Sequence, residues 1–236
     1  MTDHGHSQTD IAARLSAPPA AGHLRDAIYG GIDGSVTTFA IVAGVAGAGL
    51  SPFVIVALGL ANVLADGFSM AAGNYSGTKA ELDNARRLRQ VEEDHLRRFP
   101  EGERLELKEI LRAKGLSGAT LEAATEEISR NRERWIAMMM EGEYGVGAIE
   151  PHPLRAALVT FAAFLVAGMI PLLPFIFALP QAFALSAVLT FGIFFGIGAA
   201  KSHWSLAKWW ASGGETLLIG GTAASIAYVV GTFFAA

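Results

Sequence analysis

The sequence predicts an all-α membrane protein with five transmembrane helices and a charged, three-helix cytoplasmic insert between the second and third of them. Three observations predict this class. The composition is 52% hydrophobic and only 17% charged, and the mean hydropathy is +0.38. Several apolar stretches are long enough to cross a bilayer. Most of the charge is confined to one segment, residues 78–150. Such a composition is typical of integral membrane proteins.

A spanning helix needs about 20 predominantly apolar residues. No Asp, Glu, Lys or Arg occurs between Ala156 and Ala200, a stretch long enough for two crossings. Pro171, Pro174 and Pro180 divide it into a hairpin, because proline ends or kinks a helix. The five expected spans are residues 26–50, 52–75, 153–173, 181–200 and 215–234.

Basic residues predict the orientation. Of the 18 Lys and Arg, 14 lie between the second and third spans, up to Arg155. The other four precede the first span or lie between the fourth and fifth. Five crossings place all of them on one face, which the positive-inside rule makes cytoplasmic. We expect the N-terminus inside, the C-terminus outside, and no cleavable signal peptide.

These boundaries predict four parts. A flexible cytoplasmic tail covers residues 1–24, helices one and two cover 25–77, the insert covers 78–150, and helices three to five cover 151–236. In the insert, span two continues as one long helix, a second helix runs from Pro100 to Gly115, and a third covers 118–145. Such a bundle is too small for an independent enzyme domain of ordinary size.

The spacing of acids in the insert indicates a metal site. Glu92 and His95 lie three residues apart, as do Glu103 and Glu106, so each pair shares a helix face. Facing Glu-x-x-His and Glu-x-x-Glu pairs are typical of carboxylate-rich iron and manganese sites. The alternative is a set of solvated helix faces. The third helix ends with Met139, Met140 and Glu143, of which the methionines are more often core residues than ligands.

Two carboxylates lie inside apolar stretches, Asp33 in span one and Asp66 in span two. A charge at membrane depth is unfavourable by roughly 2.5–3.5 kcal/mol, so such residues usually line a pathway. Asn62, Asp66 and Met70 recur every four residues, and Asp26 precedes Asp33 by seven. Oxygen ligands suit divalent cations, methionine sulfur suits Fe(II), and carboxylates can exchange protons. The alternative is structural hydrogen bonding between helices.

Small residues also predict close helix packing, at Gly30-x3-Gly34 and Gly192-x3-Gly196. Five spans do not easily enclose a pore, so we expect a homodimer with span one near the twofold axis. A net charge of −4 argues against nucleic acid as a partner, and the lack of cysteine excludes thiolate sites.

Several stretches together resemble one family. They are YGGIDGSVTTFAIVAGVAGAG in span one, LANVLADGFSMAAGNYSGTKAE in span two, FPEGERLELKEILRAKGLS and AMMMEGEYGV in the insert, and WWASGGETLLIGGTAASIAYVVG near the end. The chain resembles the vacuolar iron transporter family, the yeast and plant Fe(II)/Mn(II) importers, as a bacterial member. The resemblance covers nearly everything from Leu24 onward.

The resemblance implies a homodimer with five spans, a cytoplasmic three-helix metal-binding domain, and proton-coupled export of Fe(II) or related ions from the cytosol. By position, Asp33 and Met70 fall on the translocation path. Glu92, Glu103, Glu106 and Glu143 fall on metal-binding glutamates, with Met139 and Met140 beside them.

This chain departs from the family pattern at two positions. His95 replaces a glutamate in the first insert helix, and imidazole is neutral above about pH 6.5. Asn62 replaces an acid in span two, while Asp66 lies one turn deeper. Asp66 is a candidate for that role, and Asp26 for ion entry at the cytoplasmic mouth.

We therefore expect a transporter that moves Fe(II), and also Mn(II), Zn(II) or Co(II), out of the cytosol in exchange for protons. The metal is cargo, so no cofactor is expected. In a bacterium this would be efflux across the plasma membrane. A membrane-anchored metal sensor or scaffold is the alternative. A di-iron enzyme is disfavoured because the six histidines are scattered, at His4, His6, His23, His95, His152 and His203.

Overall fold

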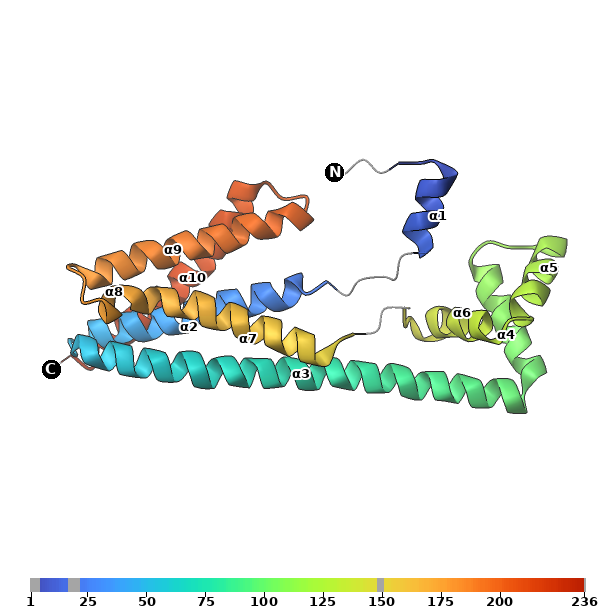
Figure 1. Ribbon diagram of the computed structural model, residues 1–236, viewed down its shortest axis with the longest axis horizontal. Helices are drawn as coiled ribbons and strands as arrows, with labels where there is room; N and C mark the ends of the chain where they lie inside the picture. Colours follow the sequence, from blue (N-terminus) through green and yellow to red (C-terminus); the bar gives the residue numbers. More distant parts are fainter. Residues whose placement is uncertain (1–4, 17–21, 148–150, 236) are drawn as a thin grey trace. The chain divides into compact units, whose positions relative to one another are not determined.

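In the computed structural model every regular element of the described residues, 5–16, 22–147 and 151–235, is helical (Figure 1). Two compact units divide the chain. The membrane unit comprises Gly22–Thr78 and His152–Ala236, and the insert unit comprises Met1–Ala21 and Lys79–Pro151. Part of the tail expected to be flexible forms helix α1, Gln8–Ser16. His4 lies outside the described residues.

Five helical segments are long and apolar enough to cross a membrane, which confirms the predicted number of spans. The second continues without a break as α3, as expected from the sequence. The fifth begins at Trp209, six residues before the predicted start at 215, because the aromatic and small residues before Glu215 are already helical. The spans are Leu24–Gly47 (α2), Pro52–Arg98 (α3), Pro153–Ile176, Ala182–Trp204 and Trp209–Thr232 (α10).

The prolines break the apolar stretch between spans three and four as predicted. Helix α7, Pro153–Met169, is followed by a 3-10 turn, η1, Ile170–Leu172, and by the short helix α8, Leu173–Ile176. The chain then reverses through two residues with positive φ, Ala178 and Gln181. Helix α9, Ala182–Lys201, leads into the 3-10 turn η2, Ser202–Trp204.

Helix α2 lies at the centre of the membrane unit, where it packs against α7, α9 and α10. Its glycines make this possible. A Cβ on Gly30 would overlap the Thr160 carbonyl of α7, and one on Gly34 would overlap the Phe164 backbone. The prediction of close packing is therefore confirmed for this pair. Within the chain, Gly192 and Gly196 make no such contact, because an added Cβ would meet no atom within 4 Å at either glycine. Packing of this pair against a second copy stays a prediction.

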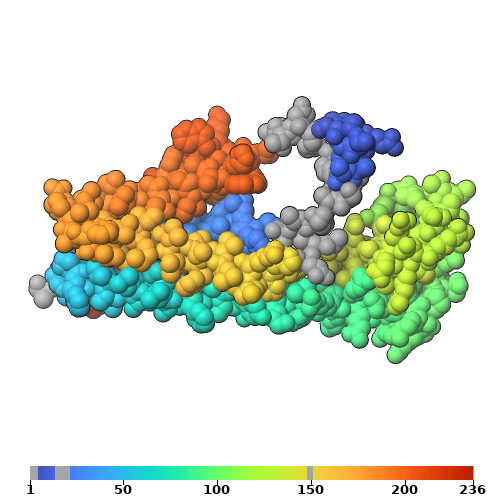
Figure 2. Space-filling view, viewed as in Figure 1, coloured from blue at the N-terminus to red at the C-terminus, as the bar shows by residue number. Residues whose placement is uncertain are grey.

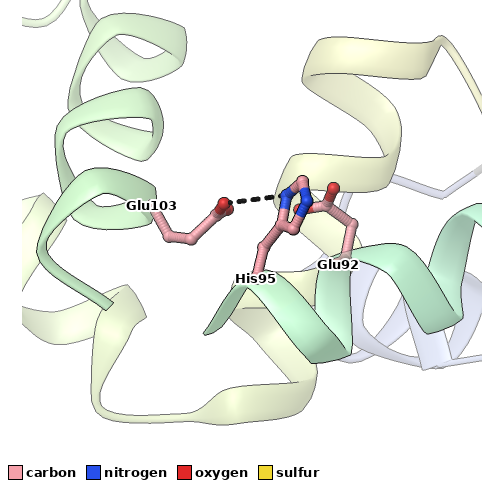
Figure 3. A group of neighbouring side chains, drawn as sticks. All are labelled: Glu92, His95 and Glu103. Atoms are coloured by element: carbon pink, nitrogen blue, oxygen red, sulfur yellow. Dashed lines mark ion pairs between the residues drawn. The ribbon is translucent and has the colours of Figure 1, made fainter. Parts of the chain in front are cut away.

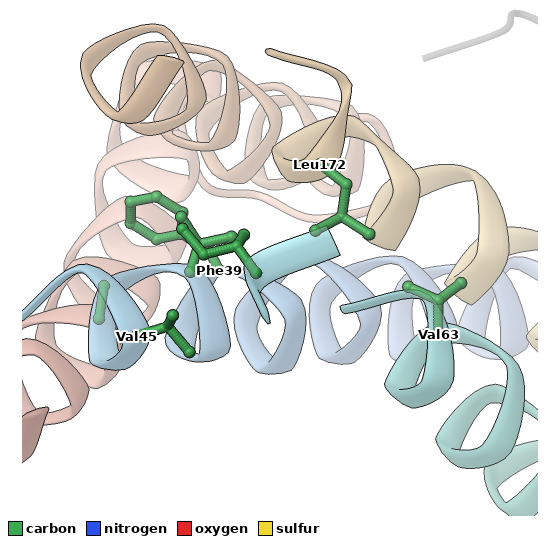
Figure 4. Close-up of a cluster of buried hydrophobic side chains, with 7 residues drawn as sticks. Phe39, Val45, Val63 and Leu172 are labelled. Carbon is green, nitrogen blue, oxygen red and sulfur yellow. The ribbon is translucent and has the colours of Figure 1, made fainter. Parts of the chain in front are cut away.

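The apolar core of the membrane unit lies around the middle of α2 (Figure 4). Phe39 and Val42 of α2 are almost fully buried, and Val63 of α3 and Leu172 of η1 pack in the same cluster. This packing fixes the orientation of α2 and, with it, the positions of its polar residues Asp26 and Asp33.

The insert contains helices α4 (Pro100–Ala113), α5 (Gly118–Ser129) and α6 (Arg132–Tyr144) beside the end of α3. The predicted third helix is therefore wrong as a single element. It is interrupted at Asn131, whose side chain caps α6 by accepting a hydrogen bond from the Arg134 N–H (3.1 Å). Asparagine favours such caps over helix interiors. Gly115 ends the α4 segment with φ of +96°, as predicted.

Candidate metal site and membrane pathway

Three side chains that could hold a metal ion meet where α3 ends and α4 begins (Figure 3). Glu92 and His95 project from one face of α3, as their spacing predicts. Pro100 starts α4 directly after the α3 end, so Glu103 in the first turn of α4 returns to the same place. His95 Nδ1 lies 3.2 Å from Glu103 Oε1. We call Glu92, His95 and Glu103 the carboxylate cluster.

The two carboxylates of the cluster are buried. Glu92 is 0% exposed and Glu103 3%. The Oε2 atom of each has no hydrogen-bond partner among the described residues. A buried charge without a partner is strongly unfavourable. This burial contradicts the alternative of a solvated face for these two residues. A proton shared between the Glu92 and Glu103 carboxyl groups, or a bound cation, would relieve the unfavourable burial.

The electrostatics of Glu103 support the same conclusion. Burial and the nearby carboxylates of Glu92 and Glu106 raise the Glu103 pKa to about 7, and His95 opposes this effect. Without a cation, about half of the Glu103 carboxyl groups therefore carry protons at pH 7. A divalent ion would displace them, because it satisfies the same carboxylates more strongly.

The three side chains of the carboxylate cluster supply part of a coordination shell. One ligand atom from each residue lies within 4.8 Å of the other two. Ligands about 2.1 Å from a common ion can be at most about 4.2 Å apart. Three ligands about 2.1 Å from one ion in tetrahedral geometry are about 3.4 Å apart, so side-chain movements of up to about an ångström would bring these atoms onto one ion.

Tyr144, at the end of α6, completes the cluster and was not predicted from the sequence. Its hydroxyl donates a hydrogen bond to Glu92 Oε1 (2.8 Å). Burial and this bond to Glu92 raise the Tyr144 pKa. The tyrosine thus stays a donor and leaves Glu92 Oε2 free for an ion. No spacing rule could have found it, because it comes from a different helix.

Glu106 and Glu143 form a second, more open group beside the cluster. Together with Glu109 and Ile110 they line a pocket of about 470 Å³ between α4 and α6. Burial, followed by the charges of Glu92 and Glu106, raises the Glu143 pKa. The four glutamates predicted from the sequence therefore share one electrostatic environment.

The two candidate methionines of the insert, Met139 and Met140, are both buried on α6. Met139 is fully buried and packs in the apolar core with Leu107 and Trp135. Met140 lines a different pocket, of about 300 Å³, beside Leu82 and Arg86. Met140 lies one helical turn before Tyr144, whose hydroxyl contacts Glu92.

Most of the other insert glutamates that the structure describes form ion pairs with lysine or arginine, and the site glutamates do not. Within the described residues, Glu92, Glu103, Glu106 and Glu143 have no Lys or Arg nitrogen within the 4.0 Å that defines an ion pair. Seven other insert glutamates each pair with a lysine or arginine: Glu93, Glu109, Glu122, Glu126, Glu127, Glu133 and Glu141. Among the described glutamates, Glu81 and Glu101 also have no such ion pair, but they are exposed, whereas Glu92 and Glu103 are buried.

In the membrane unit, Asp26 is held by two side chains from different parts of the chain. Asn74 Nδ2 of α3 donates to Asp26 Oδ1 (2.9 Å), and His23 Nδ1 lies 3.1 Å from Asp26 Oδ2. Asn74 also donates to Thr160 Oγ1 of α7 (2.7 Å). Asp26 therefore joins α2 to α3 and α7 through one amide.

Asp33 and Asp66 are both half-buried, and their carboxylates are close enough for their charges to interact. One turn along, Asn62 Nδ2 donates to Thr37 Oγ1 (3.3 Å), so this asparagine also faces α2. Asp66 and Met70 line a pocket of about 260 Å³ with Tyr29, Asn74 and Thr160. The polar stripes of the two helices therefore face each other, as expected for a pathway.

The amino-acid sequence is similar to those of one protein family. A family model described as the VIT family matches residues 24–232. The chain belongs to the VIT family. It is 32% identical to vacuolar iron transporter 1 of Arabidopsis thaliana over 209 residues, covering 87% of this chain and 83% of that protein.

Two further relatives extend the comparison beyond plants. Identity to a vacuolar iron transporter of Toxoplasma gondii is 34%, over 89% of this chain and 74% of that protein. Identity to one of Plasmodium berghei is 29%, over 65% of this chain and 58% of that protein. The family resemblance inferred from sequence motifs is confirmed. Its members are metal-ion transporters, so this chain is a transporter and not an enzyme.

Proposed function

We propose that this member of the VIT family moves Fe(II), and also Mn(II), out of the cytosol in exchange for protons. The observation that carries the proposal is the pair of buried carboxylates at Glu92 and Glu103, each with an unpartnered oxygen. A divalent cation would satisfy both, in place of the proton that the two carboxyl groups otherwise share.

Capture of the ion begins in the insert. Glu92, His95 and Glu103 bind it there, with Glu106 and Glu143 adding negative charge around the site. The carboxylate oxygens and one imidazole nitrogen suit Fe(II), Mn(II), Zn(II) and Co(II), in keeping with the borderline character of these ions. Selectivity among them depends on His95, where the family pattern has a glutamate.

Transfer through the membrane then uses the facing polar residues of α2 and α3. The ion enters at Asp26, displaces Asn74 and His23 from its carboxylate, and moves to Asp33, Asp66 and Met70. Asn62 holds Thr37 beside the path. The negative charges of two neighbouring carboxylates at membrane depth repel each other, so binding of a positive ion between them is favoured. Protons from the opposite side therefore replace the ion and reset the path.

The orientation we propose has the N-terminus and the insert in the cytoplasm and the C-terminus outside. The excess of Lys and Arg on one face supports it. Transport would be efflux in the plasma membrane of a bacterium, or storage if the protein resided in a vacuole.

A homodimer is part of the proposal. The spanning part of α3 leaves large apolar side chains such as Phe53 and Phe68 exposed, while the glycine face of α2 is already covered by α7. A second copy would complete the enclosure of the path. Because the chain has no cysteine, single cysteines along α2 and α3 can be crosslinked, and an absence of symmetric pairs would argue against the dimer.

The decisive experiment uses purified protein in liposomes that contain a metal-sensitive and a pH-sensitive dye. Uptake of Fe(II), Mn(II), Zn(II) and Co(II) is followed together with internal pH. We expect metal entry accompanied by proton exit. The Asp33→Asn, Asp66→Asn double variant should lose uptake, while Glu101→Gln, an exposed insert control, should keep it. Metal entry without a pH change would indicate a channel instead.

A membrane-anchored metal sensor remains a second candidate, because all residues of the carboxylate cluster and Tyr144 belong to the insert unit. Metal binding by the insert therefore requires none of the spans. A sensor would keep its activity with Asp33→Ala and Asp66→Ala and would lose it only with substitutions in the insert.

A further inference from the structure

Most of the tryptophan in this protein lies in residues 202–210, which comprise the connection between α9 and α10 and the first two residues of α10. Three of the four tryptophans, Trp204, Trp209 and Trp210, lie within seven residues, and the fourth, Trp135, is buried in the insert core. Figure 1 shows the connection at the end of α9 distant from α8. In Figure 2 it lies at the surface in orange-red.

The large side chains of this connection are not covered by the rest of the protein. Leu206 is 107% exposed, and the three tryptophans are each more than half exposed. So many apolar groups facing water would be strongly unfavourable. Something other than this chain must therefore contact them.

The position of these residues between two spans indicates that lipid covers their side chains. One candidate span ends at Trp204 and the next begins at Trp209. The residues between two consecutive spans lie at a face of the bilayer, because both helix ends emerge there. Tryptophan concentrates at this depth, where its ring contacts hydrocarbon and its N–H reaches polar headgroups.

The charges match the phosphates of lipid headgroups. No Asp or Glu occurs between Lys201 and Gly214, and Lys208 is the last residue before α10. Lys201 pairs with Glu215 (Nζ–Oε2, 3.4 Å), so Lys208 is the lysine that faces the headgroups. The Lys208 Nζ atom lies 5.8 Å from the Trp210 ring centre. A lysine over an indole places a positive charge beside an amphipathic ring, which suits contact with an anionic headgroup.

The aromatic rings are also held in place against the spans. Trp209 packs edge to face on Phe195 of α9, at 5.9 Å between ring centres, and His203 packs on Trp204 in the same way. We propose that residues 202–210 form an anchor in the headgroup layer of the bilayer. Lipid phosphate is its ligand, and the anchor sets the depth of α9 and α10.

This anchor bears on the pathway, although it does not depend on transport. Helix α10 packs directly on α2, with Gly231 against the Gly44 backbone. Fixing the depth of α10 therefore also fixes the depth of α2, which carries Asp26 and Asp33.

The test measures the depth of single spin labels in phosphatidylcholine–phosphatidylglycerol liposomes. The natural lack of cysteine permits one label each at Leu206→Cys, Leu105→Cys and Val188→Cys. Leu105 is 65% exposed in the insert and serves as the aqueous control, and Val188 is 69% exposed inside α9 and serves as the hydrocarbon control. Collisions with oxygen and with a water-soluble nickel chelate report depth. We expect the Leu206 label between the two controls, at headgroup depth.

Three results would overturn the anchor. The Leu206 label could match Leu105, which would place the connection in water, or match Val188, which would place it in hydrocarbon. Protection from both reagents would indicate a protein partner or a second copy. If the labels perturb folding, Trp135→Phe leaves only the three anchor tryptophans. Lipids brominated near the headgroup should then quench their fluorescence more than lipids brominated deep in the chain, and the reverse order would contradict the proposal.

Discussion

Tyr144 and Glu92 lie 52 residues apart in the sequence and share a 2.8 Å hydrogen bond in the structure. The bond joins the end of α6 to α3 and fixes one oxygen of a carboxylate whose other oxygen has no partner. A carboxylate oriented in this way is prepared for an ion, because the tyrosine occupies one side and the ion would occupy the other.

Removing the Tyr144 hydroxyl should weaken metal binding without removing a ligand. In Tyr144→Phe both oxygens of Glu92 lose their fixed orientation, and we expect metal affinity to fall by about tenfold, as for other residues that orient ligands. Isothermal titration with Mn(II) on the purified protein measures this. Tyr75→Phe, at an exposed tyrosine of α3, is the matched control, and equal affinities in both variants would contradict the role.

Neutralising a buried carboxylate should have opposite effects on the empty protein and on metal binding. Glu103→Gln removes a charge that is unfavourable in the empty site, so thermal stability without metal should rise at pH 8. The same variant should lose most of its Mn(II) affinity. Glu101→Gln, exposed on the same helix, should change neither quantity. A Glu103 variant that is less stable yet binds normally would rule out the site.

The raised Glu103 pKa makes the metal-free protein pH-sensitive. The pKa is about 7 in the folded protein against a reference of 4.5, so its contribution to stability is complete below pH 4.5 and is lost as pH rises to 7. We expect the metal-free melting temperature to fall across this range, relative to Glu103→Gln. Added Mn(II) should reverse the fall. Calorimetry at several pH values checks the sign, and parallel curves for the two proteins would refute it.

Asn74→Ala should alter ion entry while leaving the insert intact. The variant frees Asp26 Oδ1 and breaks the link to Thr160, so the KM for metal uptake into liposomes should change while Mn(II) binding by the insert does not. Asn84→Ala, on the exposed surface of α3 beyond the span, provides the comparison. Unchanged uptake kinetics in Asn74→Ala would show that this contact is only structural.

Helix contact in the membrane unit can be tested at glycine positions. Gly34→Ala places a Cβ against the Phe164 backbone, and overpacking of this kind is typically unfavourable by about 1–3 kcal/mol. We expect a lower melting temperature in detergent. Gly192→Ala, where the Cβ meets open space, should be tolerated. Equal effects would mean that α2 and α7 are not in close contact.

Much of the architecture could be predicted from local patterns. Five apolar stretches, the prolines of the hairpin and the helix that starts at Pro100 depend on composition and short-range backbone chemistry, and the structure contains them. The break at Asn131 was missed because a capping asparagine competes only weakly with the helical pattern on either side. The early start of the fifth span was missed because Gly213 and Gly214 resemble a loop.

The sequence by itself determined that this protein crosses a membrane, that its acids lie at helical spacing, and that it belongs to a transporter family. Only the tertiary structure decided which acids are left without basic partners, that Tyr144 holds Glu92, and that Met139 belongs to the core. Spacing determines which residues share a helix face. Burial and partner choice depend on which faces of different helices meet, and that is decided by packing across the whole fold.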